Sequence, residues 1–384
     1  MAPLHRIYLI PGFFGFANLG ELVYFGHVRH FLEKEFQRRN VPVELFQVSS
    51  HPTASIRVRA RDLLETIEQS ARGDDGPIHL IGHSTGGLDA RLLLTPGVSL
   101  GEGLDPSPFV GRVRTLVTLA TPHHGTPLAS LFSSMLGARM LGVLSLFTLV
   151  SLRYGRLPLS VSLKLVSLLR RPRSNERMAT LLDQLFNQLL GDFNQEHRQD
   201  LVTFFAMVSS DQSLVTQLAL EAMDLFNAGT GDRPGVRYGS VITKAAQPSL
   251  RSRLAIGLSP YDQGTYALYS FLHGRSSSFP ESRRPRLTPE QAERMRGKDG
   301  TLPSLRSSDG IVPSWSQIWG EVLDVVQADH LDVIGHFDDP DHRSNHMDWL
   351  LSGSGFLRED FERTWRKVVD FCLPPPIFRA HDGF

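Results

Sequence analysis

A serine framed by glycines follows directly on a short apolar run near residue 80. The apolar residues 78–81 lead into Gly-His-Ser-Thr-Gly-Gly at 82–87, and a helical pattern comes next. In a G-x-S-x-G turn between a strand and a helix, the serine backbone is strained, so the residues two before and two after it must be small. Gly82 and Gly86 meet that requirement. The motif alone is common, but this context predicts Ser84 as a nucleophile at the carboxyl end of a parallel strand.

Short apolar runs alternate with helix-like segments through the first 125 residues, which is typical of a mostly parallel sheet with helices on both faces. The strands we expect there are residues 7–10, 43–48, 78–81 and 113–119, with helices over 20–39 and 55–71. Strand character returns at 236–243, 310–312 and 322–326, and an amphipathic helix covers 358–371. The sequence therefore predicts an α/β fold around a mostly parallel central sheet.

The 384 residues are long for one compact domain, so we expect one core that carries inserts. Residues 1–125 are the first part of the α/β core, and residues 236–384 are the second. Between them, residues 126–235 show one helix-like pattern after another, as in a helical cap. Residues 244–307, rich in Ser, Arg, Pro and Gly, are expected as a long loop with one helix start at Thr288.

Leucine-rich stretches in the insert raise the question of a membrane span. The longest charge-free run, Met140–Leu152, has 13 residues, fewer than the ~20 that cross a bilayer. Apolar residues from Leu128 to Met140 recur at helical spacing, which favours a face packed on a core or on a lipid interface. We expect no transmembrane span. Because no charged and apolar leader precedes the first strand, we expect a cytoplasmic protein, or a secreted one whose signal has been removed.

Charge and cysteine content exclude several classes of function. Lys plus Arg and Asp plus Glu both total 40, so the formal net charge is zero and no overall field attracts nucleic acid. Cys372 is the single cysteine, which excludes an intramolecular disulfide and a metal site built from several cysteines. We expect no nucleic-acid partner.

Two backbone N–H groups are candidates to stabilise an oxyanion beside the serine. The Thr85 N–H stands at the start of the helix after the elbow, where the helix dipole favours negative charge. The second comes from the Gly-rich turn at 11–15 after the first strand, and Phe13, directly after Gly12, is our candidate. The alternative is an ordinary strand-to-helix turn in which the glycines serve backbone geometry alone.

The chain order serine, acid, histidine narrows the fifteen histidines. His83, His123 and His124 come before any suitable acid. His330 follows an apolar segment, and Asp309 lies at a turn beside a short apolar run. A neutral imidazole can accept the serine proton while its other nitrogen donates to the carboxylate. The alternatives are a turn-forming Asp-Gly at 309 and a capping or core histidine at 330.

Taken together, these motifs resemble those of the bacterial triacylglycerol lipases of the α/β-hydrolase superfamily, including the lactonizing lipases. The resemblance runs from residue 9 to residue 335 and rests on LIPGFFGF, LIGHSTGGLDAR, LATPHHGTPLA, EAMDLFNAGTGDRPGVRY, SSDGIVP and DHLDVIG. It implies an α/β-hydrolase fold, a catalytic triad of Ser84, Asp309 and His330, and an oxyanion hole from Phe13 and Thr85. It also implies that the helical insert is a mobile lid.

The resemblance further implies a structural calcium ion near the catalytic histidine. Many family members bind it partly through an aspartate two residues after that histidine, a position that Asp332 occupies here. Two other features of the family's calcium site differ here. The family usually has a glutamine six residues after the catalytic histidine, where this chain has His336, and the second aspartate, expected before the triad acid, has no clear match. Family members commonly have a histidine at the position of Pro11. This difference changes how the turn that forms the oxyanion hole is supported, but it does not remove the backbone N–H group that the turn provides.

The chemistry we predict is acyl transfer from a carboxylic ester, which requires no redox or organic cofactor. The Leu, Phe and Met content of the insert suits a long acyl chain and a lid that opens at a lipid interface, which favours a triacylglycerol lipase. Two alternatives stay open. One is a carboxylesterase or thioesterase acting on soluble acyl substrates, and the other is a non-catalytic protein that binds a lipid or a partner through the insert.

Overall fold

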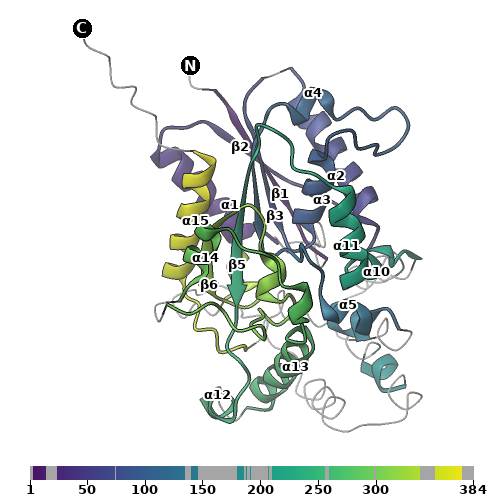
Figure 1. Cartoon of the computed structure of the whole chain (residues 1–384), viewed down its shortest axis with the longest axis vertical. Coiled ribbons are helices and arrows are strands. Elements are labelled where there is room, and N and C mark those ends of the chain that lie inside the picture. Colours follow the sequence, from purple (N-terminus) through teal and green to yellow (C-terminus); the bar gives the residue numbers. More distant parts are fainter. Residues whose placement is uncertain are drawn as a thin grey trace.

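A computed structural model of the chain has a six-stranded sheet at its centre, ordered β2-β1-β3-β4-β5-β6 (Figure 1). It describes residues 3–13, 24–73, 75–134, 140–145, 180–185, 187, 191, 206, 210–255, 259–297, 300–337 and 351–373. The neighbouring strands in this described sheet are all parallel. The strands are β1 His5–Ile10, β2 Val43–Gln47, β3 Ile78–His83, β4 Val113–Leu119, β5 Arg237–Lys244 and β6 Glu321–Gln327. The α/β fold expected from the sequence is confirmed.

Helices cover both faces of the sheet, so the strands are apolar on both sides. Ile7 and Leu9 pack with helices α1 and α15 on one face, whereas Tyr8 and Ile10 pack with α2 and α3 on the other (Figure 1). This alternation is the period of two expected for strand side chains. The four helices are α1 Gly26–Arg38, α2 Ile56–Ala71, α3 Gly86–Leu94 and α15 Arg358–Cys372.

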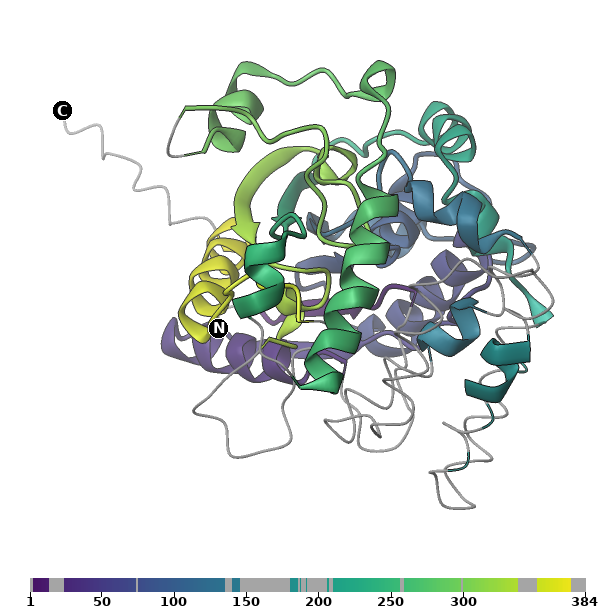
Figure 2. The ribbon, with the colours of Figure 1, turned by 90° about the horizontal axis from the view of Figure 1, so that it is seen from below.

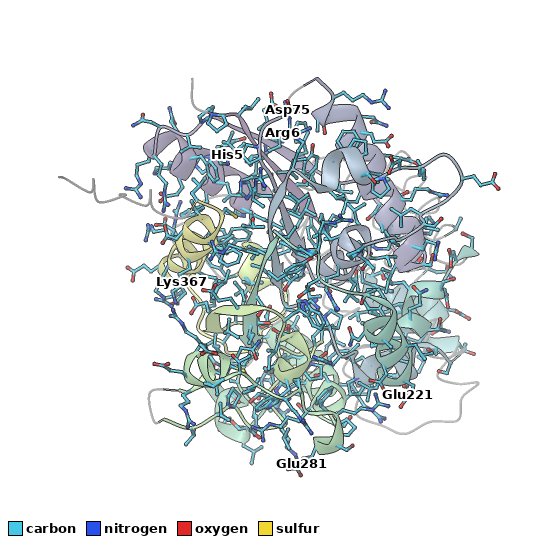
Figure 3. All side chains as sticks on the ribbon, turned by 45° about the horizontal axis from the view of Figure 1, so that its top comes forward. His5, Arg6, Asp75, Glu221, Glu281 and Lys367 are labelled. Carbon is cyan, nitrogen blue, oxygen red and sulfur yellow. The ribbon has the colours of Figure 1, made fainter. Side chains whose placement is uncertain are left out.

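Because the strands are parallel, their carboxyl ends meet at one edge of the sheet, and Figure 2 views the molecule from that side. Figure 3 labels His5 and Arg6, which begin β1, at one end of the molecule, and Glu221 and Glu281 at the opposite end. The loops that follow the strands therefore converge at the end that carries the two glutamates. Residues that function together are expected there.

The segment 244–307 is not the long loop that its composition suggests. It contains helix α13 (Pro260–Ser276), flanked by the shorter α12 (Leu250–Ala255) and α14 (Pro289–Met295). The Ser259 side chain accepts the Asp262 N–H at 3.1 Å and caps the start of α13. Tyr269 and Leu272 of this helix are fully buried in the core. The expected helix start at Thr288 is confirmed, with a capping box.

Residues 310–312 form a turn, and the strand predicted for them is wrong. Gly310 has φ of 97°, a left-handed conformation that interrupts an extended chain. The Asp309 Oδ1 atom accepts the N–H groups of Ile311 at 2.9 Å and Val312 at 2.7 Å. These side-chain to backbone bonds replace the ladder bonds of a strand.

The insert contains helices wherever the structure describes more than isolated residues of it. The leucine-rich stretch 157–169 and much of 178–190 lie outside the described residues, so the lid stays a prediction. No helix in the described part of the chain combines the length and apolarity that crossing a membrane requires. The remaining labelled elements are α4 Ser107–Val110, α5 Pro127–Phe132, α10 Ser213–Gln217, α11 Leu220–Gly229, η1 Glu281–Arg283, η2 Ser314–Gln317 and η3 Asp332–Ile334.

Candidate active site

Ser84 stands at the tip of a sharp turn between β3 and α3. Its φ of 53° is left-handed, a strained conformation for a residue with a side chain. A Cβ atom on Gly82 would lie 2.5 Å from the Gly87 nitrogen, and one on Gly86 would lie 2.3 Å from the Ile10 carbonyl oxygen. Neither position can hold a side chain, so the glycines permit this close packing of strand and helix.

His330 and Asp309 reach Ser84 from the second part of the core. His330 Nε2 lies 3.0 Å from Ser84 Oγ, and its Nδ1 lies 2.8 Å from Asp309 Oδ2. The His330 N–H also donates to the Asp309 carbonyl oxygen at 3.1 Å. When Nδ1 donates to the carboxylate, Nε2 is left to accept the serine proton. The structure thus places the three residues selected from the sequence in one hydrogen-bonded row.

The Asp309 carboxylate is oriented by more than the imidazole. Its Oδ2 atom accepts the Thr243 hydroxyl at 2.8 Å and the Gln317 amide at 3.2 Å, while Oδ1 accepts the backbone of its own turn. Sequence reasoning missed both side chains. The sequence offered one indication for Thr243, because this residue ends the predicted strand 236–243 and is therefore expected at the carboxyl edge of the sheet. It offered none for Gln317.

The turn after β1 packs directly on the serine. A Cβ atom on Gly12 would lie 2.4 Å from Ser84 Cβ and 3.0 Å from its Oγ. Phe13 lines the same pocket as Ser84. The Thr85 N–H donates to no acceptor among the residues that the structure describes. Its place after the serine, at the start of α3, suits an N–H that stabilises a developing oxyanion.

The peptide between Pro11 and Gly12 is held from both sides. Its carbonyl oxygen accepts Arg59 Nη2 at 2.8 Å, and its N–H donates to the Tyr24 hydroxyl at 3.3 Å. Arg59 in turn pairs with Asp89 at 2.8 Å, and both side chains are fully buried. Burial, opposed by the guanidinium, raises the pKa of Asp89 to about 6. Buried groups therefore orient the turn although Pro11 has no polar side chain of its own.

A pocket lies beside Ser84 and His330. Most of its wall is aliphatic or aromatic, which suits an apolar chain. It is lined by Phe13, Ser84, Thr85, Pro122, Thr126, Leu128, Phe132, Leu141, Leu144, Leu218, Ile311, Val312 and His330.

Comparisons with known proteins bear on the fold. No protein-family model and no curated protein sequence matches the chain. Among solved structures, lipase 1 from Pelosinus fermentans aligns with a TM-score of 0.50 over 95% of this chain and 98% of its own, at 18% identity. The chain has an α/β-hydrolase fold.

Two other solved structures show a similar extent of alignment. EstA from Clostridium botulinum aligns with a TM-score of 0.47 over 92% of this chain and 86% of its own, at 18% identity. The Staphylococcus hyicus lipase aligns with a TM-score of 0.48 over 96% of this chain and 95% of its own, at 15% identity. At such low identity the likeness concerns the fold rather than the activity.

Within this fold, the sequence block TPHHGTP contributes to both the pocket and the core. Pro122 and Thr126 line the pocket. His123 is buried, with Nε2 3.1 Å from the Thr118 hydroxyl and Nδ1 3.2 Å from Arg91 Nη1. Burial lowers the pKa of His123 well below its usual value, so its ring is neutral. Its contacts are structural, in keeping with its exclusion as the base.

Asp332, the residue predicted to bind calcium, is buried behind His330. Its Oδ2 atom accepts the Asp329 N–H and the Ser354 hydroxyl, each at 2.8 Å. Burial raises the pKa of both Asp332 and Asp329. Calcium takes about six to eight oxygen ligands, and within the described ranges no group of three or more His, Cys, Asp or Glu side chains is arranged so that it could hold a metal ion. These residues alone do not make a calcium site, so calcium stays a prediction and enters no step below.

Proposed function

We propose that this protein is a carboxylic ester hydrolase and, within that class, a triacylglycerol lipase. Ser84 is the nucleophile, His330 the general base and Asp309 the residue that orients the base. One observation carries the proposal: His330 Nε2 lies 3.0 Å from Ser84 Oγ and Nδ1 lies 2.8 Å from Asp309 Oδ2, beside an apolar pocket. A solved lipase with the same fold supports it.

The reaction begins when Ser84 Oγ bonds to the ester carbonyl carbon and His330 Nε2 takes the hydroxyl proton. The carbonyl oxygen becomes an oxyanion, which accepts hydrogen bonds from the Phe13 and Thr85 N–H groups. As the intermediate collapses, His330 gives its proton to the departing alcohol and an acyl-enzyme remains. Water then loses a proton to His330, attacks the acyl carbon and releases the carboxylic acid, while Ser84 regains its proton. Asp309 stabilises the imidazolium in both steps.

The pocket wall favours a long acyl chain. Phe132, Leu141, Leu144 and Leu218 offer no charge and no strong hydrogen-bond donor to a bound chain. Burying each methylene contributes about 0.8 kcal/mol, so binding strengthens as the chain lengthens until the pocket is filled. We infer that the acyl part of the substrate lies against these side chains. The helical insert would then act as the lid that opens at a lipid surface.

The experiment compares hydrolysis of p-nitrophenyl esters from C4 to C16 and of emulsified triolein by wild type and Ser84→Ala. A matched control is Ser107→Ala, since Ser107 is exposed on α4. The proposal expects long-chain activity that rises at an emulsion interface, vanishes in Ser84→Ala and persists in Ser107→Ala. Activity confined to short or thioester substrates would contradict the lipase assignment. Inactivity of all three proteins would contradict ester hydrolysis and favour a binding protein.

A further inference from the structure

A buried histidine beside the nucleophile has no part in the reaction proposed above. His83 precedes Ser84 in the elbow and is fully buried. Its Nε2 atom lies 2.8 Å from the backbone carbonyl oxygen of His330, and its Nδ1 atom lies 2.6 Å from the Tyr24 hydroxyl. The Tyr24 oxygen is 3.3 Å from the Gly12 nitrogen. These contacts join the oxyanion turn, the elbow and the base in one chain of hydrogen bonds.

The chemistry of the groups sets the direction of each bond. A carbonyl oxygen can only accept, so His83 Nε2 carries the proton that points to His330. Burial lowers the pKa of His83 well below its usual value, so the ring is neutral and Nδ1 is an acceptor. The Tyr24 hydroxyl therefore donates to Nδ1, and its oxygen accepts the Gly12 N–H. Each donor in this row of hydrogen bonds therefore faces an acceptor.

We propose that His83 and Tyr24 are positioning residues that hold the oxyanion turn and the backbone of the general base at fixed distances from Ser84. The inference rests on the function proposed above. The position of the His330 backbone determines the position of its imidazole ring. The ring centroids of His83 and His330 are 4.9 Å apart. The orientation of the Gly12 peptide sets where the next N–H points. Misplacing a reacting group by about 1 Å costs about 100-fold in rate, so this bracing has a measurable consequence.

Two other buried side chains, a tyrosine on β1 and a histidine on β3, serve as matched controls. Tyr8 on β1 is buried, and its hydroxyl lies 2.8 Å from the Ser70 hydroxyl. His79 on β3 is buried, and its Nδ1 lies 2.8 Å from the Thr115 hydroxyl. Within the part of the chain that the structure describes, the hydrogen bonds of these two side chains do not reach the serine, its base or the oxyanion turn. Their loss perturbs folding stability without altering the geometry at Ser84.

The test measures kcat and KM on a soluble p-nitrophenyl ester, per site titrated with a p-nitrophenyl phosphonate. His83→Leu removes both bonds and is expected to lower kcat by about 100-fold, with KM within about twofold of wild type. His83→Gln keeps an N–H near the Nε2 position, so its kcat is expected to be about tenfold higher than that of His83→Leu. Tyr24→Phe, a conservative change, is expected to lower kcat by about tenfold.

The controls Tyr8→Phe and His79→Gln are expected to keep the wild-type kcat even where their melting temperatures fall. The inference is overturned if Tyr24→Phe and His83→Leu keep the wild-type kcat per titrated site, because the hydrogen bonds that they remove would then play no part in positioning. Equal losses in the controls would also overturn it. A wild-type protein without turnover or titratable serine would instead remove the proposed function, and the inference with it.

Discussion

The two sides of the candidate site are held in place by different means. Around Ser84 the backbone packs so closely that Cβ atoms on Gly12 and Gly86 would lie only 2.4 and 2.3 Å from their neighbours. Around Asp309 the geometry is set by hydrogen bonds, including one from the Thr243 hydroxyl at 2.8 Å. Substitutions around Ser84 are therefore expected to lower activity by steric overlap, whereas substitutions around Asp309 are expected to lower it because the carboxylate loses its orientation. Four predictions separate these modes of failure.

The largest effect is expected on the acid side, from Asp309→Asn. The substituted amide can direct an N–H at His330 Nδ1, which forces the proton onto Nε2 and blocks acceptance from Ser84. We expect kcat to fall by about 10⁴-fold while the protein stays folded. The control is Asp324→Asn, whose carboxylate binds Lys367 at 2.6 Å instead. Steady-state kinetics with circular dichroism would check this, and a loss below tenfold would contradict it.

The next effect is expected on the nucleophile side, from Gly12→Val. The new side chain overlaps Ser84 Cβ and displaces the oxyanion turn. Losing one oxyanion donor costs about 10² to 10³ in turnover, so we expect a loss of about 10³-fold. Gly111→Val is the control, since a Cβ there has no neighbour within 4 Å. Wild-type kcat in the Gly12 variant would show that this turn takes no part in catalysis.

The third prediction concerns the buried ion pair of Arg59 and Asp89, which contacts the oxyanion turn, and it is measured as a change in the free energy of unfolding. Asp89→Asn leaves the Arg59 charge buried and uncompensated, which typically costs about 3 to 5 kcal/mol in the free energy of unfolding. Glu33→Gln breaks the exposed pair with Arg29 and should cost at most about 1 kcal/mol. Urea denaturation of both variants measures the two costs. Equal costs would contradict the expectation that the buried pair stabilises the fold more than the exposed one.

The smallest effect is expected from Thr243→Val, which removes one donor to Asp309 and keeps the side-chain shape. We expect kcat to fall by about three- to tenfold and the free energy of unfolding by about 1 kcal/mol. The control is Thr115→Val. Thr115 also lies in a strand, but its hydroxyl contacts His79 and not Asp309, so this variant should keep the wild-type kcat. If both variants keep wild-type kcat, the remaining donors to Asp309 are sufficient to orient it.

The nucleophile side could be predicted from the sequence because its determinants are adjacent in the chain. The apolar run of β3, Gly82 and Gly86 form one local pattern, and close packing leaves few alternatives. Asp309 and His330 were found from chain order and local turns. Gln317 was not, because its contact with Asp309 depends on how η2 packs against β5, which no local pattern encodes.

Two fold errors have related causes. Ile311 and Val312 look like a short strand, but the Asp309 side chain satisfies their N–H groups and makes a turn. Helix α13 was hidden by polar composition, although Tyr269 and Leu272 bury its apolar face. In both cases tertiary contacts, rather than average composition, decide the backbone conformation.

The central claim is that Ser84 is a nucleophile activated by His330 and Asp309. The most direct measurement is the rate at which a fluorophosphonate labels the protein, with the modified residue identified by peptide mass spectrometry. The account predicts a single adduct on Ser84 in the wild type, formed at least about 100-fold more slowly in Asp309→Asn. Labelling of another residue, or an unchanged rate at Ser84 in the variant, would contradict it.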